Sequence, residues 1–186
     1  MKLSAFCLLA LLAPATALAD QANFRYDYLD LGHVSQAPQT GNNATGPYAD
    51  LSYSIFDGVQ LRASYDRLDL GTGAKGKDYT LGFTGESPIN ENTDVYTDIF
   101  YVNDQVIDAG VSATENGYRL AVGLRHRLPY RFELDGYLAH NYLDTATNEA
   151  GLGLLYDATT WLSFGVGYAH DSAYTNTTTL KLRLYF

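Results

Sequence analysis

The carboxyl-terminal segment constrains this chain most, because its residues alternate with period two. One side carries Thr178, Leu180, Leu182, Leu184 and Phe186, and the other carries Thr177, Thr179, Lys181, Arg183 and Tyr185. Successive side chains of a β-strand point to opposite faces of a sheet. One face of this strand is therefore apolar, and the other carries two cations. An edge strand of a soluble sheet can show this pattern, and a strand that closes a barrel in a bilayer must show it.

The amino-terminal segment has the three parts of a secretory signal peptide. Lys2 supplies a positive start, residues 3–12 are apolar apart from Ser4, and residues 17–19 (Ala-Leu-Ala) precede Asp20. We therefore predict a signal peptide over 1–19, with a buried helix as the alternative. Its apolar core of about ten residues is shorter than the roughly 20 needed for a spanning helix. The single cysteine, Cys7, lies inside it, so the mature chain is expected to have no disulfide.

The rest of the chain alternates in segments of about ten residues, which suits tilted strands that cross a bilayer. We predict ten strands, with eight as the alternative, over 23–33, 46–55, 59–69, 77–86, 93–102, 115–126, 131–142, 148–156, 161–170 and 176–186. Short turns follow the even-numbered strands, and longer connections, including 103–114, follow the odd ones. The predicted fold is all-β: an antiparallel, transmembrane, up-and-down β-barrel formed by residues 20–186 as a single domain. An even strand count places both ends of that domain on the periplasmic side.

Composition agrees with a membrane barrel. The hydrophobic fraction is 46%, yet after the first segment no apolar run reaches helix-spanning length. The 16 Tyr, 8 Phe and 1 Trp suit aromatic belts at two bilayer interfaces, although cross-strand pairing in a soluble sheet could also use them. The net charge of −9 disfavours a nucleic-acid partner.

The first strand leaves its register open. Tyr26, Tyr28 and Asp30 oppose Asp27 and Leu31, so either orientation directs an acid toward lipid. Residues 26–32 nearly repeat as residues 65–71. If the register also repeats, Tyr26 lies outside, Asp27 lies inside and Asp30 lies near the rim.

The inward faces of the predicted strands carry charges of both signs. The acids are Asp50, Asp66, Asp78, Asp98, Glu133, Asp135 and Glu149, and the bases are Arg62, Arg119, Arg125, Lys181 and Arg183. Buried charges are costly unless paired, and a barrel of this size is little wider than side chains can fill. We therefore predict a charge network in which Arg62, Arg119, Arg125 and Arg183 pair with carboxylates such as Asp50, Asp66, Asp98 and Asp135. Small inward residues in 115–126, 148–156 and 161–170 leave room for long arginines or for a thin water path, so a conducting pore remains the alternative.

The sequence predicts no catalytic residue, metal ligand or cofactor. Residues 170–172 (His-Asp-Ser) resemble the His-x-Ser of barrel lipid A deacylases, but no acid follows on the next strand. Barrel proteases use acidic pairs with an Asp-His couple, and the chain has acidic pairs but no Asp-x-His. The four histidines lack metal-ligand spacing. A barrel enzyme with a rim site that acts on lipid or peptide is the alternative function.

Residues 17–19, the alternating strands and residues 180–186 together resemble the small bacterial outer-membrane β-barrels of the OmpX/OmpA-like class. In that family a terminal aromatic with apolar residues at every second position is the assembly signal, which here corresponds to Leu180, Leu182, Leu184 and Phe186. The opening at 26–32 is also loosely similar to small barrels described as quorum-factor-like outer-membrane proteins.

The resemblance implies a monomer in the Gram-negative outer membrane, in contact with outer-membrane lipid, lipopolysaccharide and the barrel-assembly machinery. It implies a structural or surface role, or a narrow porin-like channel. A soluble periplasmic binding barrel is the third reading.

Overall fold

The computed structural model describes residues 24–39, 42–71, 73–109, 111–173 and 175–186. The predicted signal peptide (1–19), with Cys7, lies outside these residues. Within the described part of the chain, no helix is long and apolar enough to cross a membrane.

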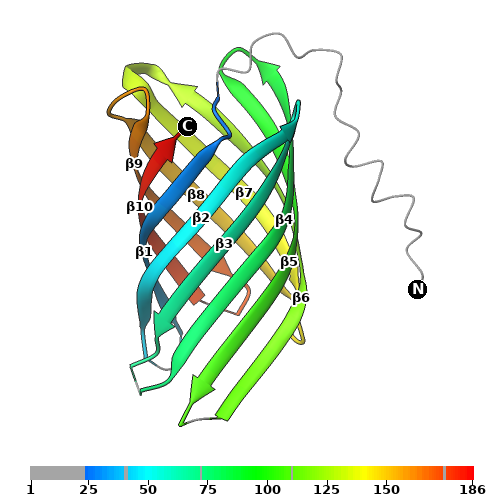
Figure 1. Ribbon diagram of the computed structural model, residues 1–186, viewed down its shortest axis with the longest axis vertical. Helices are drawn as coiled ribbons and strands as arrows, with labels where there is room; N and C mark the ends of the chain where they lie inside the picture. Colours follow the sequence, from blue (N-terminus) through cyan, green and yellow to red (C-terminus); the bar gives the residue numbers. More distant parts are fainter. Residues whose placement is uncertain (1–23, 40–41, 72, 110, 174) are drawn as a thin grey trace, which may run out of the picture.

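Ten antiparallel strands close into a barrel, in which each strand pairs with its neighbours in sequence and β1 pairs with β10 (Figure 1). The strands are β1 (Tyr28–Pro38), β2 (Ala44–Phe56), β3 (Val59–Asp69), β4 (Lys75–Asn90), β5 (Thr93–Asp108), β6 (Val111–Leu128), β7 (Phe132–Tyr142), β8 (Thr147–Asp157), β9 (Leu162–Asp171) and β10 (Thr175–Tyr185). The predicted all-β barrel is confirmed, with ten strands rather than eight.

The two ends of the barrel differ. One end, here the short-turn end, is formed by the connections at residues 57–58, 91–92 and 158–161 and by the 3-10 turn Pro129–Arg131. The carboxyl terminus also lies at this end (Figure 1). The other end, here the loop end, carries the connections that follow β1, β3, β5, β7 and β9. The prediction of a long connection over 103–114 is wrong, because β5 and β6 remain paired as far as Asp108 and Val111. Where strands extend beyond the apolar band, both of their faces can be polar. Residues 103–114 lack the alternation of a membrane-spanning strand for this reason, and the sequence therefore suggested a loop.

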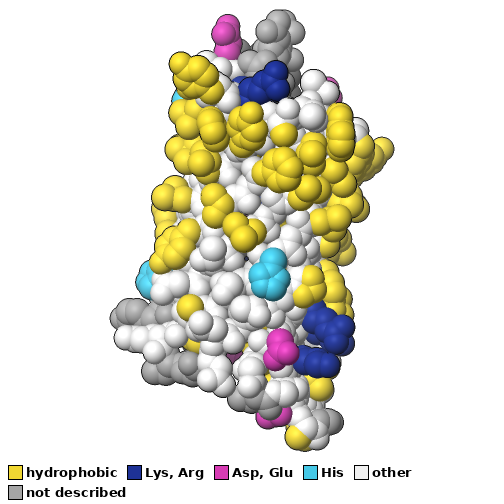
Figure 2. Space-filling model, turned by 90° about the vertical axis from the view of Figure 1, so that its left-hand side faces the viewer, with side chains coloured by type: hydrophobic (Ala, Val, Ile, Leu, Met, Phe, Trp, Pro, Cys, Tyr) yellow, Lys and Arg dark blue, Asp and Glu magenta, His cyan; other side chains and the backbone are white. Residues whose placement is uncertain are grey.

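The outer wall of the barrel is apolar. Large exposed side chains cover it, among them Leu51, Leu81, Val122, Leu138, Leu152 and Phe164. Figure 2 shows such side chains as a band over the upper part of the molecule, whereas the loop end is mostly polar. Aromatic pairs border the band, with Phe132 and Tyr156 toward the short-turn end and Tyr65 and Tyr79 toward the loop end. An apolar exterior around a polar interior is the distribution of a transmembrane barrel.

The structure fixes the open register of the first strand. Tyr28 and Asp30 point inward and are 4% and 1% exposed, while Leu31 is outward and 43% exposed. The orientation suggested by the 65–71 repeat is therefore wrong. Asp27 precedes β1, where its carboxylate accepts a hydrogen bond from the Ser54 amide at 2.5 Å. Asp30 can lie deep in the lumen because β10 supplies cations directly beside it.

Candidate functional site: the charged lumen

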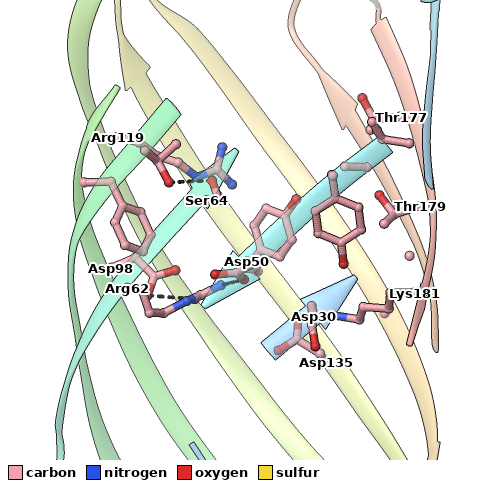
Figure 3. A pocket seen from close by; sticks show the side chains of 18 of the residues that line it. Asp30, Asp50, Arg62, Ser64, Asp98, Arg119, Asp135, Thr177, Thr179 and Lys181 are labelled. Atoms are coloured by element: carbon pink, nitrogen blue, oxygen red, sulfur yellow. Dashed lines mark hydrogen bonds and ion pairs between the residues drawn. The ribbon is translucent and has the colours of Figure 1, made fainter. Parts of the chain in front are cut away.

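A cavity of about 430 Å³ occupies the barrel interior (Figure 3). All the residues of the predicted network line it: Asp50, Arg62, Asp66, Asp78, Asp98, Arg119, Arg125, Glu133, Asp135, Lys181 and Arg183. Asp30 and Glu149 line it as well. The cavity is therefore a charged chamber whose walls come from all ten strands.

Asp30 holds two cations at the seam where the first strand meets the last. Arg183 Nε lies 2.7 Å from Asp30 Oδ1, and Arg183 Nη2 lies 2.8 Å from Oδ2. Lys181 Nζ lies 3.1 Å from the same Oδ2. Asp30 and Arg183 are direct cross-strand partners. The sequence missed Asp30 as a network member because the register of its strand was undecided.

Arg62 connects two carboxylates on different strands. Its Nη2 lies 2.5 Å from Asp50 Oδ2 and its Nη1 lies 3.7 Å from Asp98 Oδ1. Asp98 also accepts a hydrogen bond from the Thr84 hydroxyl at 2.7 Å. The guanidinium lies over the ring of Phe100, 5.4 Å from its centroid. Figure 3 shows the side chain lying between the two acids.

Arg119 forms the pair nearer the loop end. Its Nη1 and Nη2 lie 2.9 and 3.1 Å from the two carboxylate oxygens of Glu149, a bidentate contact. The Tyr137 hydroxyl donates to the same carboxylate. The acids named as examples of partners for the four arginines do not include Glu149, which is the acid that Arg119 contacts.

Arg125 pairs with Glu133 at the short-turn end of the lumen. The Arg125 Nη2–Glu133 Oε1 distance is 2.7 Å, and both side chains are almost fully buried. Asp135, a predicted partner, instead accepts a hydrogen bond from the Tyr96 hydroxyl at 3.3 Å. Asp66, another predicted partner, forms no ion pair with any described residue. It lies opposite Asp78, its cross-strand partner on β4.

Residues 24–27, which precede β1, cover the short-turn mouth of the lumen; we call them the N-terminal plug. Phe24 and Tyr26 are only 5% and 8% exposed. Arg125 lies over both rings, 4.9 Å from the Phe24 centroid and 4.4 Å from that of Tyr26. The Tyr26 hydroxyl donates to Asp94 Oδ2 at 2.9 Å. The plug and the Arg125–Glu133 pair therefore pack as one unit.

Two inward glycines leave space that is filled by a tyrosine ring from the neighbouring strand. A Cβ on Gly123 would lie 2.3 Å from Tyr96 Cζ, and a Cβ on Gly151 would lie 2.4 Å from Tyr137 Cζ. Each tyrosine is the cross-strand partner of its glycine. The expectation that these glycines make room for arginine or water is wrong at these two positions. It holds better at Gly153 and Gly167, which line the cavity.

The His-x-Ser motif at the rim is not directed into one site. His170 Nδ1 lies 2.9 Å from Asn176 Oδ1, while the Ser172 hydroxyl oxygen accepts a hydrogen bond from the Asn148 amide at 2.9 Å. Among the described residues, no group of three or more His, Cys, Asp or Glu could hold a metal ion.

The barrel resembles solved membrane barrels in fold. The KdgM porin superposes with a TM-score of 0.53 at 10% identity, covering 86% of this chain and 99% of the porin chain. The translocator domain of the autotransporter NalP from Neisseria meningitidis gives a TM-score of 0.54 at 12% identity, covering 89% of this chain and 90% of that one. No protein-family model matches the chain, and neither does any curated protein. The fold is thus that of the outer-membrane β-barrels.

Proposed function

We propose that this chain is a small, monomeric outer-membrane barrel of the OmpX/OmpA-like kind, with a structural or surface role. In this proposal a signal peptide directs export, and the barrel-assembly machinery recognises Leu180, Leu182, Leu184 and Phe186. The apolar wall contacts outer-membrane lipid and lipopolysaccharide. The role is not enzymatic.

The observation that carries this proposal is the closure of the lumen at its short-turn end. At this end the cavity is lined by Tyr26, Arg125 and Glu133. Phe24 and Asp94 do not line it, so the cavity ends below the plug. The ion pairs link neighbouring and next-but-one strands around the lumen, because Arg62 on β3 pairs with acids on β2 and β5. In this proposal the ion pairs hold the charged side chains in place and the plug covers the short-turn mouth, so the barrel offers no wide path for solutes.

A narrow channel is the second candidate, and the cavity itself favours it. The lining continues toward the loop end through Gln36, Asn141 and Thr177. If the plug and the Arg125–Glu133 pair moved together, this chamber would connect to the short-turn mouth.

Refolding into vesicles tests the proposal. The purified chain without residues 1–19 should insert into phosphatidylcholine vesicles, migrate as a heat-modifiable band and leave the vesicles impermeable to small sugars in a swelling assay. Failure to insert would contradict the membrane location. Rapid sugar-driven swelling would contradict a closed lumen and favour the channel.

A further inference from the structure

On the outer wall of the barrel, three cations lie together: Arg67, Lys75 and Lys77, which we call the basic cluster. Arg67 and Lys77 are direct cross-strand partners on β3 and β4, and Lys75 is the next outward residue along β4. The neighbours Leu68 and Gly76 are buried and Asp66 and Asp78 line the cavity, so alternation directs the three cations outward. We propose that the basic cluster binds the phosphate groups of a glycolipid, such as lipid A, in the leaflet at the loop end.

The cluster stands out because the other described cations are used elsewhere. Arg62, Arg119, Arg125, Lys181 and Arg183 line the lumen. Arg25 and Arg127 lie over aromatic rings at the short-turn mouth, and Arg131 lies in the turn after β6. Within the described residues, the outward wall therefore holds its positive charge at one place.

The cluster keeps an excess of positive charge, because its three cations have one acid beside them, Asp69, which lies opposite Lys75. None of its members forms an ion pair with a described residue. The one acid beside it, Asp69, directs Oδ1 to the Gly71 amide at 2.9 Å. Like charges directly opposite each other on a sheet are destabilising. An external anion would remove this repulsion, and phosphate oxygens suit both the bidentate guanidinium and the lysine ammonium groups.

The position of the cluster identifies the source of the phosphate. Along the β3–β4 hairpin toward the loop end, three cross-strand pairs on the lipid face follow one another. Ala63 pairs with Leu81, then Tyr65 with Tyr79, and then Arg67 of the cluster with Lys77. The two tyrosine rings pack 4.8 Å apart. Exposed aromatics of this kind mark the headgroup level of a bilayer. In Figure 2 a group of Lys and Arg side chains lies at the loop-end border of the apolar band, where lipid phosphates would lie.

The inference rests on the proposed membrane location, in which the loop end faces outward. The test compares wild-type protein with a triple variant, Arg67→Gln/Lys75→Gln/Lys77→Gln, after refolding in phosphatidylcholine vesicles. Arg131→Gln is the matched control, because it removes an exposed cation at the opposite end. Binding of phosphorylated lipid A, of dephosphorylated lipid A and of inorganic phosphate is then measured by native mass spectrometry and titration.

Wild-type protein and Arg131→Gln should retain phosphorylated lipid A and not the dephosphorylated form. Each cation removed should weaken binding about fivefold, the change that about 1 kcal/mol per cation near an anionic surface corresponds to, and the triple variant about a hundredfold. Equal retention by wild type and triple variant, or of both lipid forms, would overturn the inference. Displacement of the lipid by inorganic phosphate would overturn the assignment to a glycolipid. Insertion into phosphatidylcholine alone tests the membrane location separately, so the two failures can be told apart.

Discussion

Replacing Asp30 with alanine should destabilise the barrel strongly. Asp30 is 1% exposed and is the shared partner of Arg183 and Lys181, with N–O distances of 2.7 to 3.1 Å. Its removal leaves the buried Arg183 guanidinium uncompensated in a wall of β1 and β10. Breaking a buried pair from one side typically costs about 3–5 kcal/mol. We expect Asp30→Ala to lose about that much free energy of unfolding, measured by urea titration of the refolded protein in vesicles.

Two comparisons make this prediction sharp. Lys181→Ala should cost much less, because the Lys181 side chain is 19% exposed and Asp30 keeps its bidentate contact with Arg183. Asp144→Ala removes an exposed loop acid and should change the unfolding free energy by less than about 0.5 kcal/mol. If Asp30→Ala were no more damaging than Asp144→Ala, the seam pair would contribute nothing and the reasoning would be refuted.

Three further changes test other parts of the structure. Leu182→Arg puts a charge on the lipid face of β10 and should cost roughly 2–4 kcal/mol near the midplane; unchanged urea stability in vesicles would count against the assigned face. Deleting Phe186 should lower the amount of folded, heat-modifiable protein in outer-membrane fractions while export continues, and normal levels would show that assembly does not read this residue. Gly123→Val forces its side chain against the Tyr96 ring and should destabilise by about 1–3 kcal/mol, whereas Gly153→Ala, beside the cavity, should have little effect on the same urea titration.

The alternation of the strands was sufficient to predict the barrel and its strand number. A lipid exterior and a charged interior impose opposite requirements on the two faces, so the pattern is strong in segments such as 115–126 and 176–186. The same logic predicted which charges face inward, and the lining of the cavity agrees at every position of the predicted network.

The pairing of those charges could not be predicted from one sequence. Which acid meets which arginine depends on the stagger between strands, and this stagger brings Glu149 to Arg119 and Glu133 to Arg125. The orientation of the first strand could not be predicted for another reason. An inward Asp30 becomes acceptable only when β10 lies beside it, and the contact joins residues 153 positions apart. The plug was missed because Phe24 and Tyr26 alternate like strand residues although they lie outside β1.

Single-channel conductance in planar bilayers tests the closed lumen most directly. The wild-type chain without residues 1–19 should conduct weakly or not at all. Arg119→Ala, which leaves Glu149 without its bidentate partner, should destabilise or open the lumen, and Phe24→Ser/Tyr26→Ser should open the short-turn mouth. A large, steady wild-type conductance that neither variant changed would show that the lumen is an open pore, in contradiction to this account.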